Sequence, residues 1–232
     1  MSAAYPRDVS RVIAIDGPAG SGKSSVSREV ARRLGVQYLD TGAIYRALTW
    51  AVLERGVDPT DGGAVLEVAG AVTITSGTDP MNPTITVDGV DVSAPIRGDD
   101  VTAAVSAVSA VPEVRARLVA LQRERVASAT SGIVVEGRDI GTVVLPDAQV
   151  KVFLTASPAV RAQRRATQDE RERDLVRDVQ ETESALRARD AFDSSRTVSP
   201  LAAAEDAIVL DTSNMDFDQV VARIVELVGT VR

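Results

Sequence analysis

Gly17-Pro-Ala-Gly-Ser-Gly-Lys-Ser24 matches G-x-x-x-x-G-K-[ST], the pattern of a loop that binds nucleotide phosphates. Its lysine, Lys23, is one of only two in the chain, against twenty-four arginines. A flexible ammonium group can reach between β- and γ-phosphates, whereas a planar guanidinium suits bidentate clamping. The segment therefore predicts a site for a nucleoside triphosphate.

The residues around this loop support the prediction. Residues 12–15 form a short apolar run that is typical of a buried strand, and residues 24–34 have apolar side chains at helical spacing. Glycines let backbone N–H groups approach a phosphate, and the N-terminus of the following helix points its positive end at the anion. A glycine turn with a surface lysine is the alternative, and the agreement of pattern and flanks disfavours it. The nucleotide is expected to contact Gly17, Pro18, Ala19, Gly20, Ser21, Gly22, Lys23, Ser24 and Ser25, with the Ser24 hydroxyl on Mg²⁺.

Composition excludes several kinds of chemistry. The chain of 232 residues has neither cysteine nor histidine, so disulfides, thiolate zinc sites, Ser-His-Asp triads and histidine metal sites are impossible. A net charge of −7 disfavours nonspecific nucleic-acid binding. No apolar run approaches the roughly 18 residues of a membrane span, and residues 1–11 are polar, without the apolar core of a signal peptide. We expect a cytoplasmic protein of one or two domains that has small-molecule partners and binds neither nucleic acid nor membranes.

Five short apolar runs predict strands, and helical patterns separate most of them. The strands are expected at 12–16, 36–39, 133–136, 150–154 and 207–211, and further helices at 43–53, 112–129 and 217–228. Alternating strands and helices favour a parallel sheet, and continuous apolar runs indicate that both its faces are covered. We therefore predict an α/β fold with a five-stranded parallel sheet and helices on both faces.

Residues 61–105 interrupt this alternation. Segments 72–75 and 84–87 alternate polar and apolar side chains with period two, and Asp88-Gly89 follows as a turn. We expect a small β-rich insertion at 61–105, inside a core formed by residues 1–60 and 106–232.

A charged segment lies late in the chain. Residues 161–196 contain nine arginines and nine acidic residues, a balance that is typical of a solvated helical region. The Asn-Lys-x-Asp and Asp-x-x-Gly strings of switch GTPases are missing, which leaves a small phosphotransferase. Such an enzyme must surround two anionic reactants with positive charge and exclude water by closing. We therefore predict a mobile helical lid at about 157–190.

Three more segments have a specific pattern: Asp40-Thr-Gly-Ala-Ile-Tyr-Arg46, Glu136-Gly-Arg-Asp-Ile-Gly-Thr142 and Arg189-Asp-x-x-Asp193-x-x-Arg196. Together with the loop they resemble the bacterial cytidylate kinase family over nearly the whole chain. The resemblance implies a P-loop kinase that transfers the γ-phosphoryl group of ATP to CMP or dCMP with Mg²⁺, and a monophosphate-binding role for the insertion. Position 41 is Thr where many relatives have Ser, and position 136 is Glu where some have Asp.

The resemblance also implies residue roles. CMP binding is expected of Thr41, Arg46, Ser106, Arg115, Arg138, Asp139, Arg189, Asp193 and Arg196. Charge stabilisation during transfer is expected of Lys23, Arg161, Arg165, Arg189 and Arg196. An Arg–Asp pair can distinguish cytosine from uracil, because arginine donates to the ring acceptors and aspartate accepts from the exocyclic amino group that uracil lacks.

Some assignments stay open. Glu136 could hold Mg²⁺ through water or buttress the glycine loop, and spacing does not decide between Arg164 and Arg165. Ser106 could be a small packing residue. The loop at 212–214 is a candidate for contact with adenine, or it caps the last helix.

Two rival functions remain. An adenylate- or shikimate-type kinase would share the loop and differ in the acceptor residues, and the β-rich insertion favours cytidylate. A protein that binds ATP without transferring phosphate would leave the arginine-containing segments without a purpose. We expect a monomeric enzyme.

Overall fold

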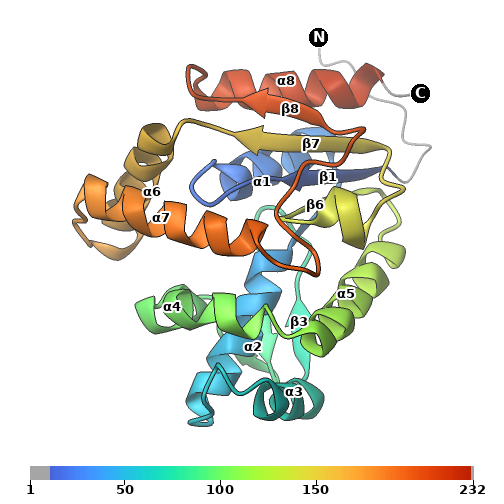
Figure 1. Ribbon diagram of the computed structural model, residues 1–232. Coiled ribbons are helices and arrows are strands. Elements are labelled where there is room, and N and C mark those ends of the chain that lie inside the picture. Colours follow the sequence, from blue (N-terminus) through green and yellow to red (C-terminus); the bar gives the residue numbers. More distant parts are fainter. Residues whose placement is uncertain (1–10, 231–232) are drawn as a thin grey trace.

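The computed structural model describes residues 11–230, in which five parallel strands form one sheet (Figure 1). The strands are β1 (Val12–Asp16), β2 (Gln37–Asp40), β6 (Ile133–Gly137), β7 (Val150–Thr155) and β8 (Ile208–Asp211), in the order β2-β6-β1-β7-β8. The five predicted strands are confirmed, with ends that differ by one residue or less. Apart from Arg11, the expected polar tail lies outside the described residues.

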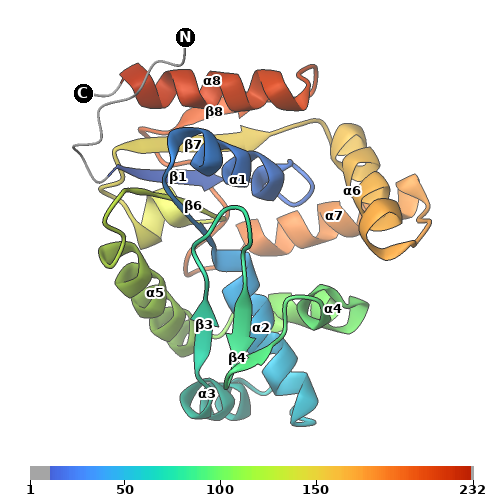
Figure 2. The same cartoon turned by 180° about the vertical axis from the view of Figure 1, so that it is seen from behind.

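Helices cover both faces of this sheet, as predicted (Figures 1 and 2). They include α1 (Lys23–Leu34), α2 (Thr41–Glu54), α5 (Pro112–Ala127) and α8 (Phe217–Thr230). Alternate side chains of β1 point to opposite faces: Ile13 and Ile15 join the apolar cluster with α1 and α8, whereas Ala14 joins the cluster with α2 and α5. Because both clusters are buried, the central strands consist almost entirely of apolar residues.

The insertion contains an antiparallel sheet, two α-helices and one short 3-10 helix. Its elements are α3 (Gly62–Ala71), β3 (Ile74–Ser76), β4 (Ile85–Val87), β5 (Val90–Asp91), the short helix η1 (Pro95–Arg97) and α4 (Asp99–Val108). The two predicted strands are present, but α3 and α4 were not predicted, and α4 crosses the expected boundary between residues 105 and 106. Three glycines lower the helix propensity of α3, and three valines and a threonine lower that of α4. Asp61 begins α3 by accepting a hydrogen bond from the N–H of Ala64.

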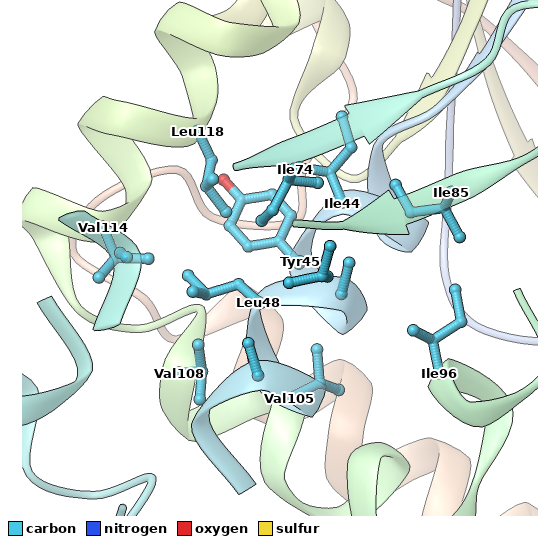
Figure 3. Close-up of a cluster of buried hydrophobic side chains, with 14 of the residues drawn as sticks. Ile44, Tyr45, Leu48, Ile74, Ile85, Ile96, Val105, Val108, Val114 and Leu118 are labelled. Carbon is cyan, nitrogen blue, oxygen red and sulfur yellow. The ribbon is translucent and has the colours of Figure 1, made fainter. Parts of the chain in front are cut away.

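The insertion shares its core with α2. Tyr45 and Leu48 of α2 lie among Ile74 and Ile85 of the small sheet and Leu118 of α5 (Figure 3). One apolar cluster therefore joins the main sheet, α2 and the insertion, and it fixes α4 relative to the strand ends.

Two helices, α6 (Pro158–Arg173) and α7 (Val179–Ser194), form an antiparallel pair in the segment predicted to be a lid. The pair projects beyond the carboxyl ends of the strands, and α7 contacts α4 (Figure 1). A single turn of π-helix, η2 (Ile140–Val144), follows β6. Within the described part of the chain, no helix is both long and apolar enough to cross a membrane.

Candidate active site

The glycine loop connects β1 to α1 in a conformation that requires glycine. Gly17 has φ 148°, and a Cβ there would lie 2.0 Å from the backbone oxygen of Leu154. Gly22 precedes α1 in the left-handed region, with φ 87°. The loop therefore places its backbone N–H groups around the N-terminus of α1, which favours an anion.

Lys23 folds back into this loop. Its Nζ donates to the backbone oxygen of Pro18 at 2.7 Å and lies 3.5 Å from Oγ of Ser21. Burial, together with the positive charge of Arg138, lowers the pKa of Lys23 to about 7, against the opposing effect of Glu136. A phosphate beside this ammonium group would favour its charged form.

Glu136, at the end of β6, contacts the loop directly. Its Oε2 accepts a hydrogen bond from Oγ of Ser24 at 3.0 Å, and its Oε1 accepts one from the hydroxyl of Tyr38. Burial and the neighbouring Asp40 raise the pKa of Glu136 to about 7. Both readings of Glu136 are compatible with this geometry, because the carboxylate buttresses the loop and also lies beside the hydroxyl expected to hold Mg²⁺.

The side-chain oxygens of Ser24 and Glu136 suit Mg²⁺ as ligands. The Ser24 hydroxyl hydrogen points to Glu136, which leaves a lone pair on its oxygen for a cation. Within the part of the chain that the structure describes, no group of three or more acidic side chains could hold a metal. A site with few protein ligands is typical of Mg²⁺, which keeps several waters and binds the substrate's phosphates.

Asp16, at the end of β1, is a buried residue that the sequence analysis missed. Its two oxygens accept hydrogen bonds from the N–H groups of Ile140 and Gly141, both at 2.8 Å. Burial raises the pKa of Asp16 to about 6. The contacts fix the turn after β6, where Arg138 and Asp139 lie. The signal that the sequence contained for Asp16 was its position directly before the glycine loop.

One cavity of about 940 Å³ joins the loop to the insertion and the helix pair. Its wall contains most of the predicted site residues: Ala19, Gly20, Ser21, Gly22, Lys23, Ser24, Ser25, Thr41, Arg46, Ser106, Arg115, Glu136, Arg138, Asp139, Arg165, Arg189, Asp193 and Arg196. Residues far apart in the sequence therefore meet at the carboxyl edge of the sheet, where ligands bind in open α/β folds.

Arginine side chains converge in this wall. Burial, and then the charges of Arg165 and other arginines, lowers the pKa of Arg46 to about 10. Burial, and then the charges of Arg138 and Arg46, lowers the pKa of Arg189 to about 9. Such mutual repulsion is costly, and a bound phosphate would relieve it.

Buried carboxylates orient several of these arginines. Asp193 accepts a hydrogen bond from Nε of Arg138 at 3.0 Å and pairs with Arg196. Arg46 instead donates through Nη1 to the backbone oxygen of Ile96 at 3.1 Å and to Oγ1 of Thr102 at 2.9 Å. The guanidinium groups are therefore preorganised for an anion.

A buried ion pair lies in the cavity wall beside these arginines. Nη2 of Arg115 is 2.6 Å from Oδ2 of Asp139, and both side chains are almost fully buried. Arg115 also donates to the backbone oxygen of Ser109 at 3.1 Å and lies over the ring of Tyr45. Ser106 lines the same region. The pair presents one donor group and one acceptor group on neighbouring side chains.

Thr41, at the start of α2, supports the turn after β6. Its Oγ1 donates to the backbone oxygen of Glu136 at 2.7 Å. The hydroxyl that the sequence analysis expected at this position is thus in place at the cavity wall.

Some predicted residues lie outside the cavity wall. Arg161 donates to the backbone oxygens of Ala156 at 3.2 Å and Ala19 at 3.1 Å, and it pairs with Asp190. It therefore braces the glycine loop, and its expected role in charge stabilisation during transfer stays a prediction. Gly17 and Pro18 supply backbone oxygens, to Arg138 and Lys23 respectively.

The structure separates Arg164 from Arg165. Arg164 donates to Oγ1 and the backbone oxygen of Thr212, each at 2.8 Å, whereas Arg165 lines the cavity. The loop at 212–214 does not line this cavity, and Asp216 caps α8 by accepting from the N–H of Gln219. Asp216 rather than 212–214 therefore caps α8, and the contact of 212–214 with adenine stays a prediction.

A glycine loop, a parallel sheet and a cationic cavity at its carboxyl edge together define a P-loop phosphotransferase. Comparison with protein families identifies which one. A model of the cytidylate kinase family matches residues 13–230, so the chain belongs to the cytidylate kinase family. This confirms the resemblance inferred from the sequence.

Individual relatives agree with this assignment. The chain is 58% identical to the cytidylate kinase of Streptomyces avermitilis over 221 residues, which cover 95% of this chain and 94% of that one. It is 56% identical to the cytidylate kinase of Mycobacterium avium over 217 residues, 94% of each chain. Among solved structures, an uncharacterized protein from Eubacterium ventriosum has a similar fold, with a TM-score of 0.51 at 13% identity over 96% of this chain and 99% of that chain.

Proposed function

We propose that this protein transfers the γ-phosphoryl group of ATP to CMP or dCMP, giving ADP and CDP or dCDP, inside the 940 Å³ cavity. The observation that supports this most is that one cavity wall contains the glycine loop, the converging arginines and the Arg115–Asp139 pair. The three groups suit a triphosphate, an acceptor phosphate and a base, respectively.

The triphosphate occupies the loop between Ala19 and Ser25. Backbone N–H groups and the N-terminus of α1 bind the phosphates, and Lys23 turns from its contact with Pro18 toward the β- and γ-oxygens. Ser24 and Glu136 would hold Mg²⁺, Glu136 through water. The metal neutralises charge on the phosphates when it is bound.

The acceptor nucleotide lies between α2, α4 and α7. Arg46, Arg138 and Arg189 clamp its phosphate, because their guanidinium groups already converge there. Thr41, Ser106, Asp193 and Arg196 line the nucleotide's surroundings. Arg115 donates to the ring acceptors of cytosine, and Asp139 accepts from its amino group.

Transfer needs positioning and charge, and no general base, because a monophosphate oxygen is already a nucleophile. Lys23, Arg165, Arg189 and Arg196 neutralise the charge that develops on the transferring group. Arg161 contributes through the loop, since its guanidinium holds Ala19. Closure of the α6–α7 pair, which contains most of the predicted lid at about 157–190, over the insertion at 61–105 excludes water.

The proposed binding groups lie in the wall of a single cavity, and we propose that the enzyme acts as a monomer. A cavity of this size suits small nucleotides, and the net charge of −7 disfavours nucleic acid as a partner. The lack of cysteine is compatible with a reducing cytoplasm, where we place the reaction.

An assay of ADP release with ATP and Mg²⁺ tests the proposal. CMP, dCMP, UMP, AMP and shikimate are offered as acceptors at equal concentrations. We expect the highest kcat/KM with CMP and dCMP. Turnover of AMP or shikimate without turnover of CMP would contradict the proposed substrate, and ATP binding without any turnover would contradict phosphoryl transfer itself.

A further inference from the structure

Four alternating charges in the cavity wall connect the insertion with α6. Nη2 of Arg177, in the loop between α6 and α7, is 2.5 Å from Oδ1 of Asp99, which begins α4. Nε of the same arginine is 2.7 Å from Oδ2 of Asp169 on α6. The other oxygen of Asp169 is 3.0 Å from Nη2 of Arg165, one helical turn earlier. We call Asp99, Arg177, Asp169 and Arg165 the charge relay.

Asp169 is the buried centre of this relay, with a side chain only 2% exposed. Because each of its oxygens contacts a different guanidinium, the carboxylate cannot rotate without breaking one of the two contacts. A buried carboxylate held at both oxygens therefore fixes the orientation of Arg165.

Other arginines of the cavity have comparable acceptors. Asp193 orients Arg138 and Arg196, and the backbone oxygen of Ile96 orients Arg46. Arg165 has the more exposed position, at 26%, and a long exposed side chain loses entropy when it is held in one orientation. Asp169 restrains Arg165 at Nη2, beside the contact of Nη1 with Oε1 of Gln168 at 3.4 Å.

The contact between Arg177 and Asp99, the outer contact of the relay, is exposed to solvent. Asp99 is 59% exposed and Arg177 is 32% exposed, so their ion pair contributes little to the stability of the fold. The two residues lie 78 positions apart and on different elements, the first turn of α4 and the loop of the helix pair. Their contact exists only when these two elements are adjacent, and it is weak enough to break when they separate.

We infer that Asp169 is a positioning residue for Arg165, and that Arg177 links it to Asp99 so that Arg165 is oriented when the helix pair meets α4. The inference rests on the role proposed for Arg165 in the transfer. It assigns to Asp169, Arg177 and Asp99 a function that acts through Arg165 rather than through contact with the reacting atoms.

Asp169→Asn tests the inner half of the relay. The substitution keeps the shape of the side chain and removes its charge, and the exposed neighbour Glu170, changed to Gln, is the matched control. With the monophosphate that the wild type phosphorylates fastest, we expect ~10-fold lower kcat for Asp169→Asn and less than ~2-fold change in either KM, because orientation and not binding is lost. Glu170→Gln should match the wild type, and thermal unfolding checks that both variants are folded.

Coupling to Arg165 distinguishes positioning from a structural role. If Asp169 acts through Arg165, then Asp169→Asn lowers kcat no further in an Arg165→Ala background. An equal loss of kcat in both backgrounds would overturn the inference, as would an Asp169→Asn variant indistinguishable from Glu170→Gln. Since the assay uses whichever monophosphate the wild type accepts, failure with CMP would contradict the proposed substrate alone.

Hydrogen exchange tests the outer half without relying on turnover. Amides at 99–103 and 175–179 should become protected when a non-hydrolysable ATP analogue and the monophosphate are added together. We expect Arg177→Ala and Asp99→Asn each to weaken that protection in both segments, and the double variant to add nothing more. Full protection in Arg177→Ala would refute the link to α4.

Discussion

Asp190 of α7 accepts a hydrogen bond from the backbone N–H of Ala19 in the glycine loop, at 3.1 Å and across 171 positions of the chain. The other oxygen of Asp190 pairs with Arg161, which donates to the backbone oxygen of Ala19 at 3.1 Å. Both backbone groups of one loop residue are thus held by the α6–α7 pair. The position of the loop therefore depends on the position of these helices.

We expect Asp190→Ala to disturb both stability and ATP binding. The substitution leaves the buried guanidinium of Arg161 without its carboxylate and the Ala19 N–H without its acceptor. The free energy of unfolding should fall by ~2–3 kcal/mol, and KM for ATP should rise by roughly 10-fold as the loop loosens. Urea unfolding and steady-state kinetics measure the two effects.

Glu183→Gln on the same helix is the control for this prediction. Glu183 pairs with the exposed Arg187 at 2.6 Å, a surface contact, so its loss should change the free energy of unfolding by less than about 0.5 kcal/mol. Equal effects of the two substitutions would mean that Asp190 does not support the loop.

Lys23→Ala should remove activity without unfolding the protein. The ammonium group makes only local contacts with Pro18 and Ser21, and burial already disfavours its charge, so the variant should unfold at or above the wild-type temperature. Because the lysine is expected at the β- and γ-phosphates, kcat should fall by ~10³-fold or more. A folded Lys23→Ala variant with wild-type kcat would contradict the assignment of the loop.

Asp139→Asn should weaken the preference for cytosine over uracil. The carboxylate accepts from the amino group of cytosine in our proposal, and an amide offers a donor that suits the O4 acceptor of uracil. We expect the ratio of kcat/KM for CMP to that for UMP to fall by ~10–100-fold, with KM for ATP changed less than ~2-fold. A rise in KM for ATP with an unchanged ratio would place Asp139 outside the base site.

Asp139→Ala is a less informative variant at this position. It would leave Arg115, which is 3% exposed, without its partner at 2.6 Å, and so destabilise the protein as well. The ratio of kcat/KM for CMP to kcat/KM for UMP, measured on the same variant, separates base recognition from that loss of stability.

The main fold was predictable because its signals are local. The run 12–16 and the glycine pattern after it specify a buried strand, a turn and a helix start within a few residues. Helix α4 was missed although Val101, Val105 and Val108 recur at helical spacing, because its valines and threonine lower its helix propensity. All three valines are buried, and Val105 and Val108 join the apolar cluster that contains α2.

The site residues that belong to sequence motifs were predictable. The orientation of an arginine was not predictable where it depends on a carboxylate from a distant part of the fold. Arg161 and Arg165 have the same residue type and similar sequence surroundings, but Asp190 turns the first toward Ala19 and Asp169 holds the second at the cavity. Asp190 and Asp169 each meet their partners only after α6 and α7 have packed. A single sequence contains no direct signal for such contacts.

Glu136 should make the stability of the unliganded protein depend on pH. Burial, and to a lesser degree the negative charge of Asp40, raises the pKa of Glu136 from 4.5 to about 7 in the folded state. Between these two values the folded protein binds more protons than the unfolded chain, so stability falls as pH rises through that window. Above pH 7 the full cost of the buried charge is present, and below pH 4.5 it is absent.

Glu136→Gln removes this titration while keeping the size of the side chain. At pH 8 we expect the free energy of unfolding of the variant to exceed that of the wild type by about 2 kcal/mol. Near pH 5 the two free energies of unfolding should be similar, because the wild-type carboxyl is already mostly protonated there. Its kcat should fall, because the charge that raises the cost of folding is the one proposed to hold Mg²⁺ with Ser24. Urea unfolding at pH 5, 6, 7 and 8 without nucleotide measures the difference. Parallel curves for the two proteins across that range would show that Glu136 does not titrate there.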